Sequence, residues 1–108
     1  YYKKEPRVGL LLDLGHLNIA SNYLRFDRFN MIEKIFGKYP DKIFEIHISE
    51  NEGREDSHKV SDSDSWQLEL LRQNKKFLLD IPLVFEWRKI TNSQIYQHFG
   101  ALKKLLEN

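Results

Sequence analysis

Six side chains that can bind a metal or transfer a proton lie at or just beyond the ends of three apolar segments. The six are Asp13, His16, His47, Asp56, His58 and Glu86. A histidine or glutamate within a buried apolar strand is strongly destabilising unless it is paired or coordinated. Carboxylates and neutral imidazole are the usual protein ligands of zinc, manganese and iron. The residue types therefore predict a site for one of these divalent metals.

Each of these residues also has a purely structural interpretation. An aspartate at a strand end, such as Asp13, commonly caps a helix or stabilises a turn. A buried His47 or Glu86 can be a hydrogen-bonded part of the interior, and Asp56 in a polar loop can be solvated. The metal interpretation depends on whether these residues converge in space, and therefore on the elements that carry them.

Three short apolar segments, Val8–Leu12, Ile43–Ile48 and Ile81–Trp87, have the length and composition of strands buried on both faces. We predict strands near 8–13, 43–48 and 82–87. Helical spacing follows each of them: around Met31 to Phe36, from Trp66 to Leu78 with Ser65 as N-cap, and from Thr91 or Asn92 to Leu106.

This βαβαβα order predicts an α/β fold with parallel strands joined by crossover helices. The C-terminal ends of parallel strands lie side by side and carry the chemistry of such folds. A closed (β/α)8 barrel takes about 250 residues, whereas this chain has 108. We therefore expect one unit, either a small three-stranded α/β domain or part of a larger barrel.

The composition excludes several classes of protein and of metal site. The chain has a formal net charge of +1 and no cysteine, so disulfide frameworks and thiolate metal sites are absent. The balanced charge gives no overall electrostatic footprint for nucleic acid. No apolar run approaches the roughly 20 residues that span a bilayer, and we expect a cytoplasmic protein without membrane contact.

Three motifs occur in the order found in one superfamily. DLGHLNIAS, EIHISENEGREDSH and VFEWR resemble the sixth-, seventh- and eighth-strand motifs of xylose isomerase-like TIM barrels, which include sugar phosphate isomerases and epimerases and the endonuclease IV-like AP endonuclease family 2. The resemblance implies that residues 1–108 form a single partial domain, the C-terminal three βα units (strands six to eight) of a (β/α)8 TIM barrel. It also implies a C-terminal fragment of a longer protein, whose N-terminal barrel half is the missing partner.

The resemblance assigns roles residue by residue. Asp13, His47 and Glu86 would bind the metal that the branches of the superfamily share, and Glu86 would also be the catalytic base. His16 would contact substrate in an epimerase-like enzyme. In an endonuclease IV-like enzyme His16 would bind an additional metal together with Asp56 and His58. Arg54 lies where epimerase-like relatives place a substrate-binding arginine.

The leading functional prediction is a metal-dependent isomerase or epimerase acting on a small sugar or sugar phosphate. The alternatives are an endonuclease IV-like phosphodiesterase, a multinuclear iron oxygenase that modifies peptides, and a non-catalytic fragment. The chain lacks the Gly-x-Gly stretch that usually follows Asp-x-His in the first two branches, and instead continues to Trp66, which is closer to the oxygenase branch. The chain by itself is expected to be inactive.

An incomplete barrel leaves one face of its sheet bare. We predict that Leu11, Ile46 and Phe85 form an exposed apolar surface there, and that the isolated chain forms homo-oligomers through it.

Overall fold

A parallel three-stranded sheet forms the centre of the protein. The computed structural model describes residues 7–59, 65–78, 80–88 and 90–107. The strands β1 (Leu10–Asp13), β2 (Ile43–Ile48) and β3 (Leu83–Phe85) lie in the order β1-β2-β3. Both pairings are parallel, as the βαβ pattern predicted. The outer two strands are shorter than the predicted ranges 8–13 and 82–87. With its helices, the sheet forms a small α/β domain.

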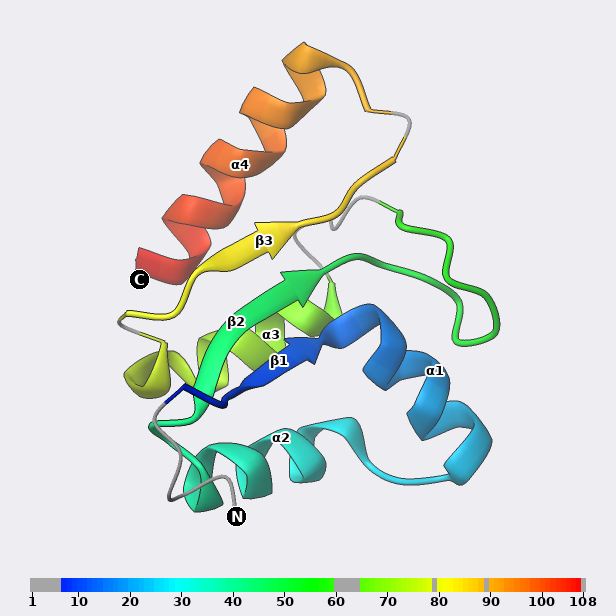
Figure 1. Ribbon diagram of the computed structural model, residues 1–108. Helices are drawn as coiled ribbons and strands as arrows, with labels where there is room; N and C mark the ends of the chain where they lie inside the picture. Colours follow the sequence, from blue (N-terminus) through cyan, green and yellow to red (C-terminus); the bar gives the residue numbers. More distant parts are fainter. Residues whose placement is uncertain (1–6, 60–64, 79, 89, 108) are drawn as a thin grey trace.

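The described residues form four α-helices beside the sheet (Figure 1): α1 (Leu14–Leu24), α2 (Arg28–Lys38), α3 (Trp66–Gln73) and α4 (Asn92–Glu107). The side chain of Ser65 caps α3 as predicted, by accepting a hydrogen bond from the Gln67 N–H. The predicted helix from 66 to 78 ends early, because Asn74 closes α3 and a short 3-10 helix, η2 (Lys75–Phe77), follows. Helix α1 was not predicted, and it begins directly at the end of β1.

The hydrophobic core lies between one face of the sheet and two helices. Ile46 and Ile48 of β2 pack with Ile32 and Phe36 of α2 and with three buried leucines of α3. These leucines are Leu68, Leu70 and Leu71. Right-handed crossovers bring successive helices to the same side of a parallel sheet, which explains why α2 and α3 share this face.

Helix α4 packs beside the edge strand β3 (Figure 1). The rings of Phe85 and Phe99 meet edge to face at a centroid distance of 6.1 Å, and Trp87 contacts His98 in the same way at 6.0 Å. His98 therefore packs on an aromatic ring of the segment after β3, as its interpretation as a packing residue predicted.

The face of the sheet that α2 and α3 leave uncovered differs from the predicted apolar surface. Leu11 is 52% exposed, as expected, but Ile46 is only 1% exposed because its side chain points into the core. Phe85 is half-buried and also packs against the core. The prediction was wrong for these two residues because side chains alternate between the faces of a strand, which places Ile46 on the side opposite to Glu45 and His47.

The open face of the sheet therefore carries acidic residues and a histidine beside Leu11. The register aligns Leu11 with Glu45, and Asp13 with His47, on neighbouring strands. Paired residues on parallel strands point to the same side. This face thus combines an exposed leucine near the middle of β1 with titratable groups toward the C-terminal ends.

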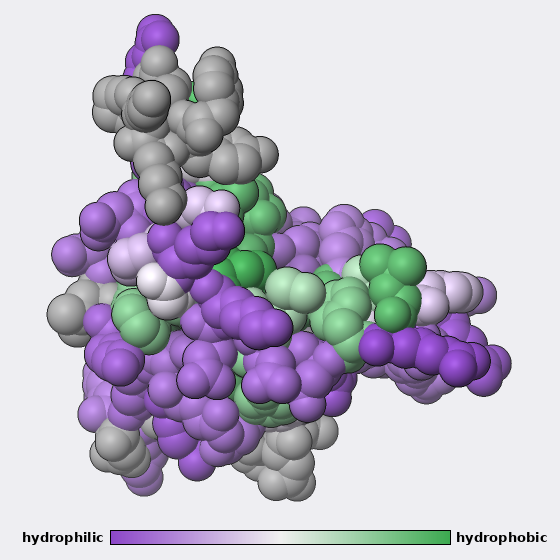
Figure 2. Space-filling model, turned by 90° about the horizontal axis from the view of Figure 1, so that it is seen from below, coloured by the Kyte–Doolittle hydropathy of each residue, from purple (hydrophilic) through white to green (hydrophobic). Residues whose placement is uncertain are grey.

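The surface seen from below, the side of α2, is mostly hydrophilic, with hydrophobic side chains visible between the polar ones (Figure 2). The exposed large hydrophobic residues include Tyr23 and Leu24 at the end of α1, Phe44 in β2, and Tyr96 in α4. Among the described residues, no helix combines the length and apolar character needed to cross a membrane.

Candidate metal centre

Three predicted metal ligands converge at the C-terminal edge of the sheet. Asp13 is the last residue of β1, His47 lies near the end of β2, and Glu86 directly follows β3. One ligand atom from each lies within 4.8 Å of the other two. All three side chains are partly buried, with exposed fractions of 16% for Asp13, 20% for His47 and 34% for Glu86. Two carboxylates and an imidazole at this spacing are a suitable donor set for zinc, manganese or iron.

The His47 ring lies between two carboxylates. Its Nδ1 is 2.7 Å from Oε1 of Glu86, and its Nε2 is 2.7 Å from Oε2 of Glu45. Burial lowers the pKa of His47, but the hydrogen bonds to Glu45 and Glu86 outweigh this effect and leave the pKa raised. The raised pKa extends the pH range in which His47 is protonated, so a cation that binds this ring would have to displace a proton.

A second group of titratable side chains adjoins the first. Asp56 Oδ2 is 2.9 Å from His16 Nε2 and 3.0 Å from His58 Nε2. His16 Nδ1 is 3.4 Å from Asp13 Oδ2, and His58 Nδ1 is 3.0 Å from the backbone carbonyl oxygen of Glu86. The sequence prediction grouped His16, Asp56 and His58, and the structure brings them together beside the Asp13–His47–Glu86 cluster.

Hydrogen bonding shifts the pKa values within this second group. The pKa of His16 is raised, mainly by its hydrogen bond to Asp56 and further by the charges of Asp13, Asp56 and Glu86. The pKa of Asp56 is lowered, first by the hydrogen bond to His16 and then by the one to His58. These groups thus form a hydrogen-bonded network at the solvent-exposed edge of the site, where His16 is 61% exposed.

Asn51 holds the loop that carries Asp56 and His58 against α1. Its Nδ2 donates to the carbonyl oxygen of Gly15 at 2.9 Å, and its Oδ1 accepts from Asn18 Nδ2 and from the Gly53 N–H, both at 2.8 Å. A Cβ atom on Gly15 would lie 2.7 Å from Ser49 Oγ, so only glycine allows this close approach. The loop is thereby fixed to α1, the helix that Asp13 caps.

Two backbone contacts fix the far end of the loop. Glu50 and Lys59 form an antiparallel bridge with N–H to carbonyl distances of 2.9 and 2.8 Å. The Arg88 N–H donates to the carbonyl oxygen of His58 at 3.0 Å. His58 itself has a left-handed backbone conformation with φ of 52°. The loop therefore joins β2 to the residues after β3 and brings His58 next to Glu86.

Arg54, the predicted substrate-binding arginine, lies exposed on the same loop. Its charge lowers the pKa of the neighbouring Glu52, for which the hydrogen bond to Lys59 is the largest cause. Among the described residues, no contact joins Arg54 to the two clusters.

Glu45 was missed by the sequence prediction, which treated residues 43–48 as a nearly continuous apolar strand. The available signal was the two-residue spacing between Glu45 and His47. Residues i and i+2 of a strand share a face, so two titratable residues at this spacing point to a polar face of the sheet.

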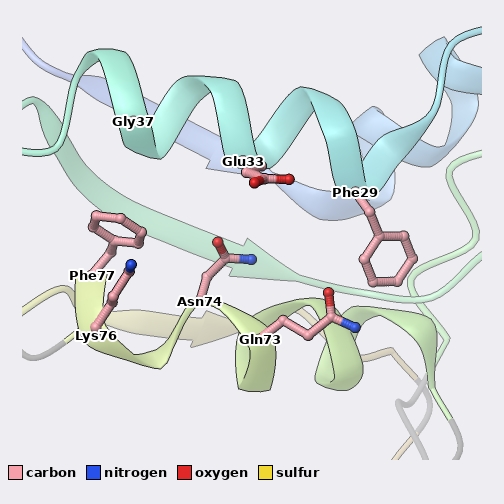
Figure 3. Close-up of a pocket in the computed structure, with 7 residues that line it drawn as sticks. All are labelled: Phe29, Glu33, Gly37, Gln73, Asn74, Lys76 and Phe77. Atoms are coloured by element: carbon pink, nitrogen blue, oxygen red, sulfur yellow. The ribbon is translucent and has the colours of Figure 1, made fainter.

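A separate cavity of about 420 Å³ lies between α2 and the α3–η2 segment (Figure 3). Phe29 and Glu33 line it from α2, and Gln73, Asn74 and Lys76 line it from the other side. It lies on the helix-covered side of the sheet, whereas the Asp13–His47–Glu86 cluster lies on the open side. The cavity therefore has no part in the chemistry of the candidate metal centre.

Comparison with known proteins leaves the family open: no family model, no curated protein and no solved structure matches this chain. The resemblance to xylose isomerase-like barrels rests on the three sequence motifs and stays a prediction. What the chain's own geometry contributes is the parallel sheet and the two adjoining clusters at its C-terminal edge.

Proposed function

We propose that this chain provides the metal centre of a metal-dependent isomerase or epimerase that acts on a sugar or sugar phosphate. The observation that carries the proposal is the convergence of Asp13, His47 and Glu86 within 4.8 Å on the open face of the sheet. Their positions at the C-terminal ends of successive parallel strands correspond to where (β/α)8 barrels place their active sites.

The proposal includes a larger fold, in which β1, β2 and β3 are strands six to eight of a xylose isomerase-like barrel. Two features support it. The helices α2 and α3 cover one face of the sheet, as the outer helical layer of a barrel does. The other face carries Glu45 and His47, which would point into the barrel interior. Further strands beside β1 would then contribute the remaining ligands and the rest of the substrate pocket.

The donor set fits a divalent cation. Three protein ligands leave coordination positions open, as in catalytic rather than structural metal sites. When bound, such a cation polarises carbonyl and hydroxyl oxygens of a substrate. One carboxylate oxygen of Glu86 would bind the cation in place of its contact with His47 Nδ1, and the second would take a proton from the substrate carbon and return it. His16 and Arg54 at the rim would bind substrate hydroxyl or phosphate oxygens.

The His16–Asp56–His58 cluster favours a second candidate function. Asp56 Oδ2 contacts both imidazoles. The ligand atoms of this cluster do not all lie within 4.8 Å of one another, as those of the first cluster do, so they would have to move closer together to bind a second metal. Clustered metals at short separation are typical of phosphodiesterases, in which they activate water and stabilise the leaving oxygen. An endonuclease IV-like phosphodiesterase is therefore the alternative, and a multinuclear iron oxygenase would use the same pair of clusters.

The metal site is tested by titrating the metal-free 108-residue chain with zinc or manganese in a calorimeter. We expect weak binding, because the remaining ligands would come from further strands of the proposed barrel, and affinity that rises with pH as His47 loses its proton. His47→Ala should abolish binding at the first site, whereas the matched control His98→Ala should bind like the unsubstituted chain. Equal affinity of the His47→Ala variant would remove His47 from the site.

The reaction class is tested in the complete barrel protein that the proposal implies. Glu86→Gln keeps the size of the side chain and removes its charge. We expect it to lower ketose–aldose interconversion or epimerisation at least ~100-fold, since misplacing a reacting group by about 1 Å already has an effect of this order. His58→Ala should have a much smaller effect on an isomerase. Cleavage of a phosphodiester that depends equally on His58 and Glu86 would favour the alternative.

A further inference from the structure

Glu45 is a carboxylate on the open face of the sheet that the proposed mechanism does not yet use. It lies near the middle of β2, two residues before His47, and is aligned with Leu11 of β1. Its side chain is 39% exposed. Glutamate is depleted in strands, so its presence beside a candidate ligand calls for an explanation.

The contact between Glu45 and His47 requires both side chains to lean toward each other. Residues i and i+2 of a strand are separated by roughly 6.6 Å along its axis. The carboxylate oxygen of Glu45 nevertheless lies 2.7 Å from His47 Nε2. An independent solvent-directed glutamate would not approach the ring this closely, which indicates a directed hydrogen bond.

The two ring nitrogens of His47 have different surroundings. Nδ1 faces Glu86, a member of the candidate metal cluster, whereas Nε2 faces Glu45. An imidazole that binds a cation through one nitrogen carries its proton on the other. If Nδ1 binds the cation, the remaining proton is on Nε2, and Glu45 is the group placed to accept a hydrogen bond from it.

We propose that Glu45 is a positioning residue of the metal centre, which fixes the His47 ring with Nε2–H directed at Glu45 and Nδ1 directed at the cation. This inference rests on the proposed metal site and adds a carboxylate–histidine–metal arrangement to it. Such outer partners orient the imidazole and raise its basicity, and their removal typically weakens metal binding about 10- to 100-fold.

The experiment compares zinc binding by the 108-residue chain and two variants, followed by NMR of the His47 ring, which suits weak affinities. Glu45→Ala removes the acceptor, and we expect its zinc affinity to fall about 10- to 100-fold. Glu45→Gln keeps an acceptor oxygen without the charge, so its zinc affinity should lie between those of the unsubstituted chain and Glu45→Ala. The matched control is Glu69→Gln, an exposed carboxylate on α3 that pairs with Arg72, and it should bind like the unsubstituted chain.

A second readout reports the ring directly. Long-range proton–nitrogen correlation spectra of the zinc-bound chain should show zinc at Nδ1 of His47 and a proton at Nε2. In zinc-bound Glu45→Ala we expect a mixture of rings that bind zinc through Nδ1 and rings that bind it through Nε2. Zinc at Nε2 in the unsubstituted chain would overturn the proposal, because Glu45 would then be a ligand rather than a positioning residue.

The outcomes separate this inference from the function on which it rests. If the unsubstituted chain binds zinc, and Glu45→Ala and Glu69→Gln bind it with equal affinity, the role of Glu45 is overturned. The proposed metal centre is not affected by that outcome. No binding by the unsubstituted chain would overturn both. If Glu45→Ala does not fold, as judged by far-UV circular dichroism, Glu45→Gln decides the question, because its shape is unchanged.

Discussion

At the scale of single residues, the contact between His16 and Asp56 links the protonation of these two side chains to the stability of the fold. The pKa of His16 is raised above its ordinary value of 6.5, and that of Asp56 is lowered below 3.8. The stabilisation linked to His16 is fully present below pH 6.5 and is lost as the pH rises through the higher pKa of the folded state. The stabilisation linked to Asp56 is present above pH 3.8 and is lost as the pH falls. The pair therefore stabilises the fold most between these two values.

Replacing His16 tests this linkage in the metal-free chain. With a chelator present, we expect the free energy of unfolding of the unsubstituted chain to fall more between pH 6 and pH 8 than that of His16→Gln, as measured by urea denaturation. Asp56→Asn should flatten the pH dependence in the same way, because it removes the negative charge that helps to raise the pKa of His16. An unchanged pH dependence in both variants would show that the pair forms no charged contact in solution.

The strand pattern was sufficient to place Asp13, His47 and Glu86 side by side, because the C-terminal ends of parallel strands share an edge. Their role as ligands stays a prediction. The contact of His47 with Glu45 was not foreseen, since a glutamate flanked by Phe44 and Ile46 was read as part of an apolar strand. Which nitrogen of an imidazole meets which carboxylate depends on side-chain conformations that spacing does not specify.

At the scale of elements, the hydrogen bonds of Asn51 join the β2–α3 loop to α1. Asn51 is 9% exposed, so its removal leaves the carbonyl oxygen of Gly15 and the amide of Asn18 without this partner in a buried setting. We expect Asn51→Ala to lower the free energy of unfolding by about 1–3 kcal/mol. The measurement is urea denaturation, with Asn30→Ala on the exposed surface of α2 as control, for which we expect a change within about 0.5 kcal/mol.

The same variant tests whether the loop positions the second cluster. Asn51→Ala should loosen Asp56 and His58 relative to His16. If the alternative function with two metal ions holds, the variant should weaken binding of the second ion more than binding of the first. Equal weakening at both sites would indicate a general loss of stability instead.

The contrast between α2 and α1 shows what periodicity can predict. Helix α2 was recognised because Ile32 and Phe36 recur on one apolar face, and both are fully buried. Helix α1 was missed because its buried face carries Gly15, Asn18 and Ser21 together with a single leucine, Leu14. Leu14 and Leu17 pack against the core, but the polar part of the buried face is held by hydrogen bonds, and a search for apolar spacing does not detect such a helix.

At the scale of the whole molecule, the sheet ends at β1 on one side within the described structure. Leu11 lies in this edge strand and is 52% exposed. Edge strands with exposed apolar residues promote association. We expect the isolated chain to self-associate in sedimentation experiments at high micromolar concentration, and Leu11→Lys to shift it toward the monomer. Leu24→Lys, which changes an exposed leucine at the end of α1, is the control and should leave association unchanged. A strict monomer for the unsubstituted chain would count against an incomplete barrel.

The parallel α/β arrangement followed from the alternation of strand and helix patterns, whereas the barrel remains a proposal. Three strands determine which face of the sheet is covered by helices, because crossover handedness is nearly invariant. Closure into a barrel depends on strands that would pair beside β1, and neither the described fold nor the residue pattern of these 108 residues contains them.

Asp13 ends β1 and also caps α1: its Oδ1 accepts a hydrogen bond from the His16 N–H at 2.8 Å. A cation held by the same carboxylate is therefore linked to the opening and closing of the first helical turn. Amide hydrogen exchange of residues 16 and 17 should slow when the cation binds, by on the order of 100-fold at a free concentration of 100 times Kd, if that turn must open for the cation to leave. Asp13→Asn keeps the cap and removes the charge, so it should retain the basal protection of the turn and lose the additional slowing. The start of α1 would then act as a built-in reporter of metal occupancy, readable without any substrate.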